Sequence, residues 1–335
     1  MDIGLIGFGG VGQAFIKLLL KKKEYLYEKY KITINLKYII NSTGGIYDSE
    51  GINLLELKNY LESGNEISKY LKWGNFNIDT IITNRDVDTI IELTHTNIKN
   101  GEPGLTHIRK ALINKINVVT GNKGPILLKY KELKELANEN KVSLMAGCTT
   151  GGALPSINGG VIEVAGSEIT YMECILNGTT NYILTEMSDK NISYEEALIT
   201  AQKLGIAELN PEIDVEGYDT AIKIIILANI ILNANLTLKD VKIKGITNVK
   251  SEYLKKLKEE GKKLKLIGII KNDKEVKVEV QLCEIDRNHP LYCVDGKNKG
   301  ITYKTDSIGD ITIIGGASGT ENAAAAILRD LINMK

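Results

Sequence analysis

The chain has 335 residues, of which 43% are hydrophobic, and its 42 basic residues balance its 42 acidic residues. This composition is typical of a globular protein with room for two domains, and the lack of net positive charge argues against a nucleic-acid partner. The longest apolar run, residues 224–232, is too short to cross a membrane, and the N-terminus has no signal-peptide pattern. We therefore expect a cytoplasmic protein with no membrane partner.

The cysteines are widely separated, and only three histidines accompany them. This spacing argues against a disulfide framework and against a zinc site. We expect reduced thiols in the core at all four positions, which are Cys148, Cys174, Cys283 and Cys293.

Strand-like and helix-like segments alternate through the first 150 residues. The first predicted strand covers residues 2–6, and further strands are predicted at 36–40, 89–93, 118–120 and 142–145. The predicted helices include 13–20, 105–115 and 128–140. Such alternation predicts an α/β fold with a Rossmann-type, doubly wound parallel sheet.

A glycine-rich turn joins the first strand to the first helix and reads Gly7-Phe8-Gly9-Gly10-Val11-Gly12. In G-x-G-x-x-G, one glycine permits a tight turn, one lets backbone amides approach a pyrophosphate, and one lets the helix pack closely. A tight turn without a ligand is the structural alternative. The position between a strand and a helix favours binding of NAD or NADP by residues 7–12.

The end of the second predicted strand bears on the choice between NAD and NADP. An acidic residue there would hold the ribose 2′-hydroxyl, but the chain reads Asn41-Ser42-Thr43. Neutral side chains do not repel a 2′-phosphate, so the sequence favours NADP, although no arginine lies nearby.

Small and polar residues follow Gly147, and we place the boundary of a second, mixed α/β unit there. In this unit Ser193 and Glu196 form a capping box, with Gly205 as a left-handed helix cap. Period-2 alternation after residue 264 predicts an antiparallel hairpin, followed by strands at 300–304 and 311–314. A glycine turn at 315–319 precedes a last helix at 323–334.

An acidic block runs from Glu208 into an apolar helix that contains Asp219 and Lys223. A surface ion pair is the simplest explanation of this i,i+4 spacing, but the helix is apolar on every face and therefore buried. A buried ammonium needs a partner or a solvent-filled cleft, which favours a functional role for the pair of Asp219 and Lys223.

Lys123 follows a strand end, where ligands bind in parallel sheets, although an exposed loop lysine would fit this position as well. We give His95, which also follows a strand end, no catalytic role.

Together these motifs resemble homoserine dehydrogenase, which interconverts aspartate semialdehyde and homoserine on the route to threonine, methionine and isoleucine. The resemblance covers nearly the whole chain and includes the blocks 118–125, 176–183 and 208–223, and Gly319. It implies a dinucleotide domain (1–150 with 316–335), a catalytic domain (151–244), and an antiparallel sheet (245–315) that pairs two subunits into a homodimer. The chain resembles the short form of the family, without an appended regulatory domain, so feedback by threonine through such a domain is not expected.

The resemblance also assigns roles to individual residues. Lys223 is the proton donor and acceptor, and Asp219 and Lys123 belong with it to the catalytic set. The amino-acid substrate is bound by Glu208, Asp214, Asp219 and Lys123. The cofactor site includes the glycine loop and Asn41, Ser42, Thr94, Lys123 and Gly319.

One departure concerns a monovalent cation. Many relatives carry a glutamate in the block that begins here at Gly147, and it holds Na⁺ or K⁺ together with backbone carbonyls. That glutamate is missing in this sequence. The aligned carbonyls are those of Thr150, Gly152 and Leu154, and a site made of carbonyls alone should hold a cation less firmly.

Two other functions stay open. One is another Rossmann-type reductase of an amino-acid aldehyde or ketone, and the other is a dinucleotide-binding sensor without catalysis.

Overall fold

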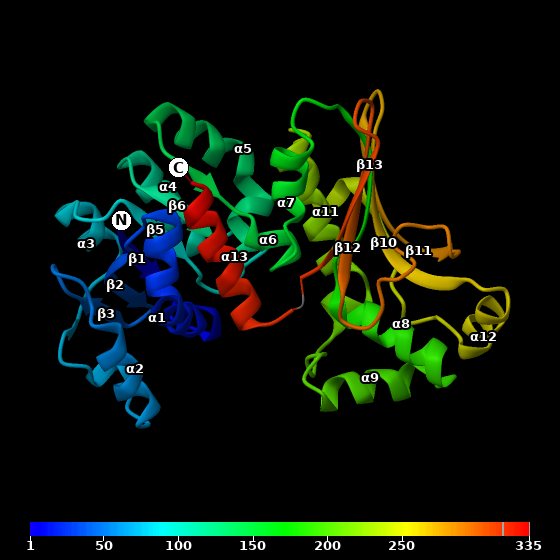
Figure 1. The fold of residues 1–335 in the computed structure, drawn as a ribbon, viewed down its shortest axis with the longest axis horizontal. Helices are drawn as coiled ribbons and strands as arrows, with labels where there is room; N and C mark the ends of the chain where they lie inside the picture. Colours follow the sequence, from blue (N-terminus) through cyan, green and yellow to red (C-terminus); the bar gives the residue numbers. More distant parts are fainter. Residues whose placement is uncertain (317, 335) are drawn as a thin grey trace. The chain divides into compact units, whose positions relative to one another are not determined.

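The computed structural model describes residues 1–316 and 318–334 and divides into two compact units. Unit 1 consists of Met1–Thr149 and Gly319–Lys335, and unit 2 consists of Thr150–Ser318 (Figure 1). Ala317, in the predicted glycine turn before the last helix, lies outside the described residues, as does Lys335.

Unit 1 contains a seven-stranded sheet in the order β4-β3-β2-β1-β5-β6-β7. Its strands are β1 (Asp2–Ile6), β2 (Asn35–Asn41), β3 (Gly44–Tyr47), β4 (Trp73–Gly74), β5 (Thr89–Glu92), β6 (Asn117–Thr120) and β7 (Leu144–Met145). The parallel pairings of β1, β2, β5, β6 and β7 match the predicted Rossmann-type sheet. The two antiparallel strands at one end of the sheet, β3 and β4, were not predicted, because β3 begins with two glycines and β4 has only two residues.

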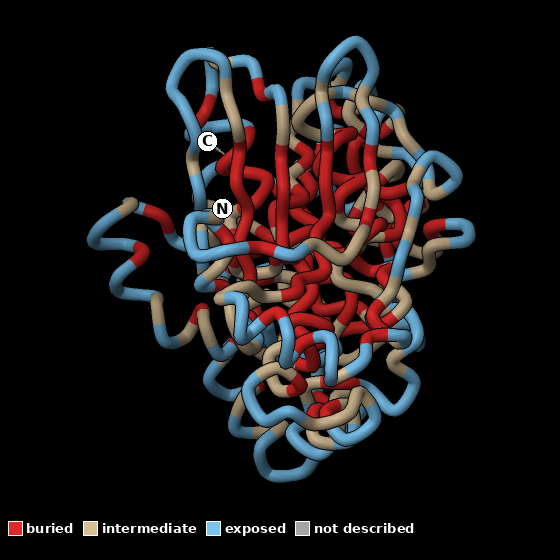
Figure 2. Tube along the Cα trace, turned by 90° about the vertical axis from the view of Figure 1, so that its right-hand side faces the viewer, coloured by how far each residue is buried: buried red, intermediate tan, exposed pale blue. Residues whose placement is uncertain are grey.

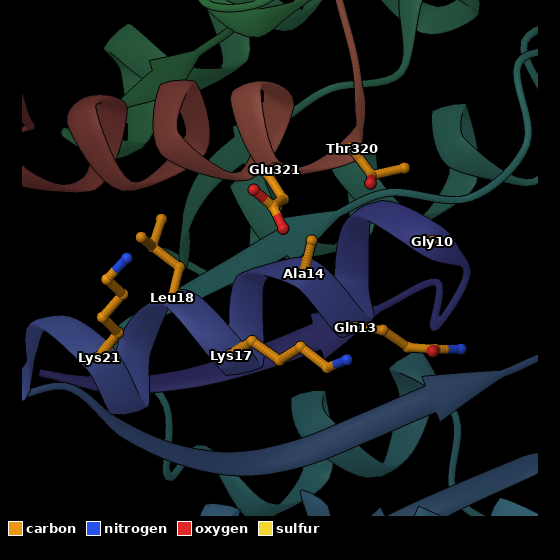
Figure 3. A pocket seen from close by; sticks show the side chains of 8 residues that line it. All are labelled: Gly10, Gln13, Ala14, Lys17, Leu18, Lys21, Thr320 and Glu321. Atoms are coloured by element: carbon orange, nitrogen blue, oxygen red, sulfur yellow. The ribbon is translucent and has the colours of Figure 1, made fainter. Parts of the chain in front are cut away.

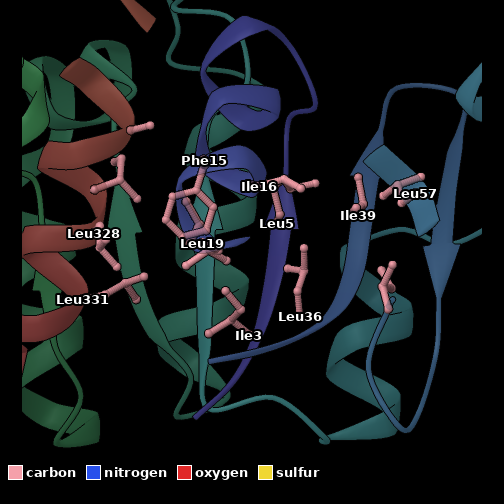
Figure 4. Packing of buried hydrophobic residues seen from close by; sticks show 14 of the residues in the cluster. Ile3, Leu5, Phe15, Ile16, Leu19, Leu36, Ile39, Leu57, Leu328 and Leu331 are labelled. Atoms are coloured by element: carbon pink, nitrogen blue, oxygen red, sulfur yellow. The ribbon is translucent and has the colours of Figure 1, made fainter. Parts of the chain in front are cut away.

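Helices cover both faces of this sheet. They are α1 (Gly10–Tyr30), α2 (Leu54–Glu62), a 3₁₀ turn (Ile67–Lys69), α3 (Ile78–Asn84), α4 (Gly104–Ile113), α5 (Lys123–Asn140) and α13 (Thr320–Asn333). Helices α1, α2 and α13 enclose an apolar core with β1 and β2 on one face (Figure 4). The other face carries α3, which meets β1 at Gly4, and the contacting pair α4 and α5.

Helix α5 begins five residues earlier than predicted. The Asn122 side chain accepts a hydrogen bond from the Gly124 amide and so caps the helix ahead of Lys123. The backbone of Lys129 is not helical, so the apolar spacing does not continue through this point. The periodicity alone therefore located only the second part of the helix.

Asp330 ties the C-terminal helix to the end of the parallel sheet. Its carboxylate is fully buried and accepts a hydrogen bond from the Gly147 amide at 2.8 Å. A Cβ atom at Gly147 would lie 2.5 Å from Asp330 Oδ1, so only glycine fits this contact. Burial raises the pKa of Asp330 to about 6, although Arg329 and the amides of Gly147 and Cys148 act in the opposite direction.

This raised pKa predicts that Asp330→Asn stabilises the protein at neutral and alkaline pH. The folded chain holds the proton more tightly than the unfolded chain, so the carboxyl group's contribution to stability is greatest below about pH 4 and declines as the pH rises to about 6. Asparagine keeps an oxygen for the Gly147 amide and cannot ionise. We expect a gain of about 1–3 kcal/mol at pH 8 and a flatter pH dependence in thermal melts. The control is Asp189→Asn at an exposed position, and lower stability of Asp330→Asn at pH 8 would contradict the argument.

Unit 2 contains a six-stranded sheet in the order β13-β12-β8-β10-β11-β9. Its strands are β8 (Ile169–Ile175), β9 (Val241–Ile243), β10 (Lys263–Asn272), β11 (Val276–Ile285), β12 (Lys299–Thr305) and β13 (Asp310–Gly315). All pairings are antiparallel except that between β9 and β11. The hairpin of β10 and β11 and the two later strands lie where the sequence predicted them.

The helices of unit 2 have unequal lengths. They are α6 (Cys148–Gly151), which begins in unit 1, and α7 (Ser156–Asn158), a π turn (Gly159–Glu163), α8 (Gly178–Lys190), α9 (Tyr194–Lys203), α10 (Glu212–Val215), α11 (Tyr218–Ile231), a 3₁₀ turn (Leu238–Asp240) and α12 (Ser251–Glu259). The predicted capping box at Ser193 is present, and Gly205 has a φ of +66°. Within the described residues, no helix is long and apolar enough to span a bilayer.

Helix α11 packs on one face of the unit 2 sheet because Gly268 of β10 leaves space for it. A Cβ atom at Gly268 would lie 2.5 Å from Ile224 and 3.1 Å from Thr220. On the other face, residues of β8, β10 and β11 pack against Leu291 and Val294 of the loop before β12. Buried residues follow the inner strands, and the turns are exposed (Figure 2).

The cysteines depart from the prediction of four core thiols. Cys174 is buried, Cys148 and Cys283 are half-buried, and Cys293 is exposed. Cys293 lies in the loop that covers the second face of the sheet, where Leu291 and Val294 supply the buried side chains.

Candidate active site

The glycine loop lies at the carboxyl end of β1, beside the ends of β2 and β5. Gly7 has a φ of +99°, and a Cβ atom there would lie 2.4 Å from the Leu93 carbonyl carbon. A Cβ atom at Gly12 would lie 2.7 Å from the Gly7 carbonyl oxygen. Gly9 has extended backbone and nothing within 4 Å of a Cβ atom. Gly7 and Gly12 are therefore required by the fold, whereas Gly9 leaves open space for a ligand to approach the backbone.

A buried carboxylate organises the neighbouring strand ends. Glu92, at the end of β5, is fully buried and accepts hydrogen bonds from the amide and hydroxyl of Thr94. The Thr120 hydroxyl, at the end of β6, lies 3.3 Å from the other Glu92 oxygen. Asn122 donates to Thr94 Oγ1 and to the His95 carbonyl, both at 3.3 Å, and caps the helix that starts with Lys123. This network fixes two predicted site residues, Thr94 and Lys123, at one edge of the sheet.

The remaining predicted cofactor residues also belong to unit 1. Asn41 ends β2, and its Oδ1 accepts hydrogen bonds from the amide and hydroxyl of Thr43 at 2.8 and 2.9 Å. Ser42 is exposed in the turn that follows. The Gly7 amide donates to the Ile40 carbonyl at 2.8 Å, which places this strand end beside the glycine loop.

The start of α13 lies beside the start of α1. Gly319 precedes α13, and a Cβ atom at Gly10 would lie 3.0 Å from the Thr320 methyl group. A groove of about 380 Å³ runs between the two helices (Figure 3). It is lined by Gly10, Gln13, Ala14, Lys17, Leu18, Lys21, Thr320 and Glu321. Phe8 and Val11 complete the loop, and Phe8 packs partly against the core. Unit 1 thus holds every predicted cofactor residue.

Unit 2 holds the predicted proton-transfer residues. Lys223 Nζ lies 2.5 Å from Asp219 Oδ2 and donates a hydrogen bond to the Leu176 carbonyl at 2.8 Å. The two side chains are 12% and 8% exposed, so the ammonium reaches solvent only in part. An ammonium has three N–H donors, and in the described part of the chain two of them have these partners.

The Asn177 side chain holds the carboxylates of this cluster in place. Its Nδ2 lies 2.7 Å from Asp214 Oδ1 and 2.9 Å from Asp219 Oδ2. Its Oδ1 accepts from the Thr180 amide and caps α8. Asn177 follows the end of β8, so one residue links the sheet, the helix cap and both carboxylates. The sequence contained this residue in the block 176–183, but no pattern there pointed to its partners.

Glu208 is the remaining predicted substrate residue of unit 2. It is exposed in the segment between α9 and α10, and its backbone carbonyl accepts from the Gln202 amide group. Lys123 belongs to unit 1, whereas Asp214, Asp219 and Lys223 belong to unit 2.

The carbonyl turn, which we define as residues 150–154, contains the three predicted ligands of a monovalent cation. Lys299 of β12 is only 4% exposed, and its Nζ donates a hydrogen bond to the Gly151 carbonyl at 3.0 Å. The Gly151 carbonyl also accepts from the Leu154 amide, and the Leu154 carbonyl accepts from the Ser156 amide.

This donor set does not fit an additional cation. A second cation beside this ammonium would be repelled, by about 4 kcal/mol at about 4 Å and an effective dielectric constant of about 20. In the described part of the chain, no group of three or more His, Cys, Asp and Glu side chains could hold a metal ion. The Gly151 carbonyl of the turn already has a buried ammonium as its partner.

Comparisons with known proteins give the same family for both units. Residues 7–146 match the family model for the NAD binding domain of homoserine dehydrogenase, and residues 155–332 match the model for homoserine dehydrogenase. A homoserine dehydrogenase of Methanocaldococcus jannaschii is 42% identical, with 100% of this chain and 98% of the relative covered. An NAD(+)-dependent homoserine dehydrogenase of Pseudomonas canavaninivorans is 32% identical over 99% and 95% of the two chains. The crystal structure of an Archaeoglobus fulgidus protein assigned as a homoserine dehydrogenase has a TM-score of 0.89 at 32% identity and covers 99% of this chain and 98% of that one.

Proposed function

The chain belongs to the homoserine dehydrogenase family, and from this premise we propose that it interconverts L-aspartate 4-semialdehyde and L-homoserine with Lys223 as the proton donor and acceptor. It is an NAD(P)-dependent oxidoreductase that acts on the CH–OH group of a small-molecule substrate.

The ion pair of Lys223 and Asp219 is the observation that carries the proposal. In the reducing direction, a hydride from the nicotinamide forms the new C–H bond at the aldehyde carbon. The electrons of the C=O π bond move to oxygen, which then takes a proton from the Lys223 ammonium. In the oxidising direction, neutral Lys223 removes the hydroxyl proton as the hydride leaves. Asp219 and the Leu176 carbonyl hold Nζ in place through both directions.

The substrate's charged groups call for different partners. Its ammonium requires a carboxylate, and we assign Glu208 and Asp214 to substrate binding, with Asp219 shared between substrate and lysine. The exposed position of Glu208 suits a residue that meets a ligand rather than the protein core. Lys123, on unit 1, is assigned to the substrate's negatively charged groups next to the cofactor.

A direct assay tests this function. Purified protein should oxidise L-homoserine and reduce the cofactor, which absorbance at the nicotinamide band follows, with NADP and NAD in parallel. Other amino-acid alcohols serve as controls for substrate choice. Cofactor binding without turnover of any of these alcohols would disprove the proposed reaction and favour a sensor.

We further propose that NADP(H) binds at least as tightly as NAD(H). Ser42 is exposed at the end of β2, and the Asn41 amide group keeps its donors while its oxygen serves the turn. Such neutral groups can donate hydrogen bonds to a 2′-phosphate, which a carboxylate would repel. The Pseudomonas relative is named as NAD(+)-dependent, so both cofactors must be compared.

Charge substitutions at this strand end should change the preference. We expect Asn41→Asp or Ser42→Asp to weaken NADPH binding and to leave NADH binding nearly unchanged, as measured by fluorescence titration of each variant. Ser42→Asn is the matched neutral control. Wild-type protein that binds NADH more than about tenfold tighter than NADPH, a difference of about 1.4 kcal/mol, would refute this assignment.

Different segments of the chain have different proposed roles. We assign the dinucleotide to residues 1–150 with 316–335, catalysis to 151–244, and pairing into a homodimer to 245–315. The biosynthetic role is on the route to threonine, methionine and isoleucine, in the cytoplasm. Light scattering of the purified protein tests the dimer.

A further inference from the structure

The carbonyl turn at 150–154 contains a positive charge that belongs to the chain itself. Lys299 lies 148 positions away in sequence and reaches the turn from the first residue of β12. Its ammonium donates to the Gly151 carbonyl, and a Cβ atom at Gly152 would lie 3.6 Å from Nζ. The charge therefore lies against Gly151 and Gly152, in the middle of the carbonyl turn.

The surroundings of the turn are closed. Thr150 and Leu154 are fully buried, and Lys299 is nearly so. Backbone from a third segment packs against the turn, because a Cβ atom at Gly316 would lie 2.2 Å from the Leu154 amide nitrogen. A charged side chain that is buried in this way must be matched by polar groups, and the Gly151 carbonyl oxygen is one of them.

We propose that the Lys299 ammonium is a built-in replacement for a monovalent cation, and that this chain requires neither Na⁺ nor K⁺ at the carbonyl turn. An ammonium and K⁺ carry the same single positive charge. The lysine ammonium has three N–H donors, is covalently held and cannot dissociate. The missing glutamate in the block after Gly147 is consistent with this, because a fixed ammonium needs no extra carboxylate to retain it. The inference does not depend on the proposed reaction.

Thermal melting in different chloride salts at constant ionic strength tests the replacement without measuring catalysis. Wild-type protein should melt within about 1 °C in NaCl, KCl, NH₄Cl and tetramethylammonium chloride, since no ion binds at the turn. Lys299→Ala should melt several degrees lower in tetramethylammonium chloride, because it removes a buried side chain and its hydrogen bond to the Gly151 carbonyl. The same variant should recover at least half of this loss in KCl or NH₄Cl, where a small cation can enter the vacated space.

Two further variants make the result specific. Lys299→Met fills the space with an apolar chain of similar length, so it should lose stability and recover none in any salt. Lys297→Ala removes an exposed lysine two positions away and should melt like wild type in every salt.

Three outcomes would overturn the proposal. One is a wild-type melting temperature that rises and saturates with Na⁺ or K⁺ but not with tetramethylammonium. Another is a Lys299→Ala variant as stable as Lys297→Ala. The third is a loss in Lys299→Ala that no small cation restores, which would make Lys299 a packing residue. If Lys299→Ala does not fold in tetramethylammonium chloride, recovery of folded protein by refolding it in KCl replaces the melting shift as the readout.

Discussion

Replacing Lys223 with alanine is expected to lower the turnover of homoserine by about 10²–10⁴-fold, the range for a missing general acid or base. The Lys223 ammonium contacts Asp219 and the Leu176 carbonyl in unit 2, whereas the glycine loop belongs to unit 1. Cofactor affinity should therefore remain within about twofold of wild type. Steady-state rates and a fluorescence titration of NADPH measure the two quantities separately.

The variant needs controls because it leaves a buried carboxylate without its ion-pair partner. Asn177 still donates to Asp219, so the cluster keeps one hydrogen bond in Lys223→Ala. Lys223→Gln retains a neutral N–H donor on a side chain one atom shorter, and this donor cannot transfer a proton. The variant should be as inactive as the alanine variant while melting closer to wild type. Lys203→Ala removes an exposed lysine at the end of α9 and should leave the rate unchanged. Near wild-type turnover in either Lys223 variant would refute its role.

Much of the fold was predictable because it follows from local patterns. The strand, glycine turn and helix at the N-terminus, the capping box at Ser193 and the hairpin of β10 and β11 each depend on residues close together in sequence. The pair Asp219 and Lys223 was predictable for the same reason, since i,i+4 spacing on one helix brings the side chains together.

The contacts that complete the candidate site were not predictable, because they join distant segments. Asn177 meets Asp214 and Asp219, which lie 37 and 42 positions later in the chain. Lys299 meets the carbonyl turn across 148 positions. A single sequence contains these residues but gives no periodicity or spacing that pairs them. They depend on the register of β8 and β12 in the unit 2 sheet.

The glycine loop offers a test that separates a requirement of the fold from a requirement of the ligand. Gly7→Ala should lower the melting temperature by several degrees and abolish cofactor binding, because its φ is +99° and the new Cβ atom would meet the backbone of Leu93. Gly9→Ala should melt like wild type, since Gly9 has a φ of −88° and open space around it.

Cofactor binding should nevertheless weaken about 10–100-fold in Gly9→Ala, which corresponds to about 1.4–2.7 kcal/mol, the range for losing one hydrogen bond to a charged group. The added methyl group occupies the space through which a pyrophosphate would approach the amides at the start of α1. Melting curves without ligand and titrations with NADPH and NADH give the two readouts on the same samples. Unchanged affinity in Gly9→Ala would mean that the dinucleotide does not approach this part of the loop, and the turn would then serve only to join β1 to α1.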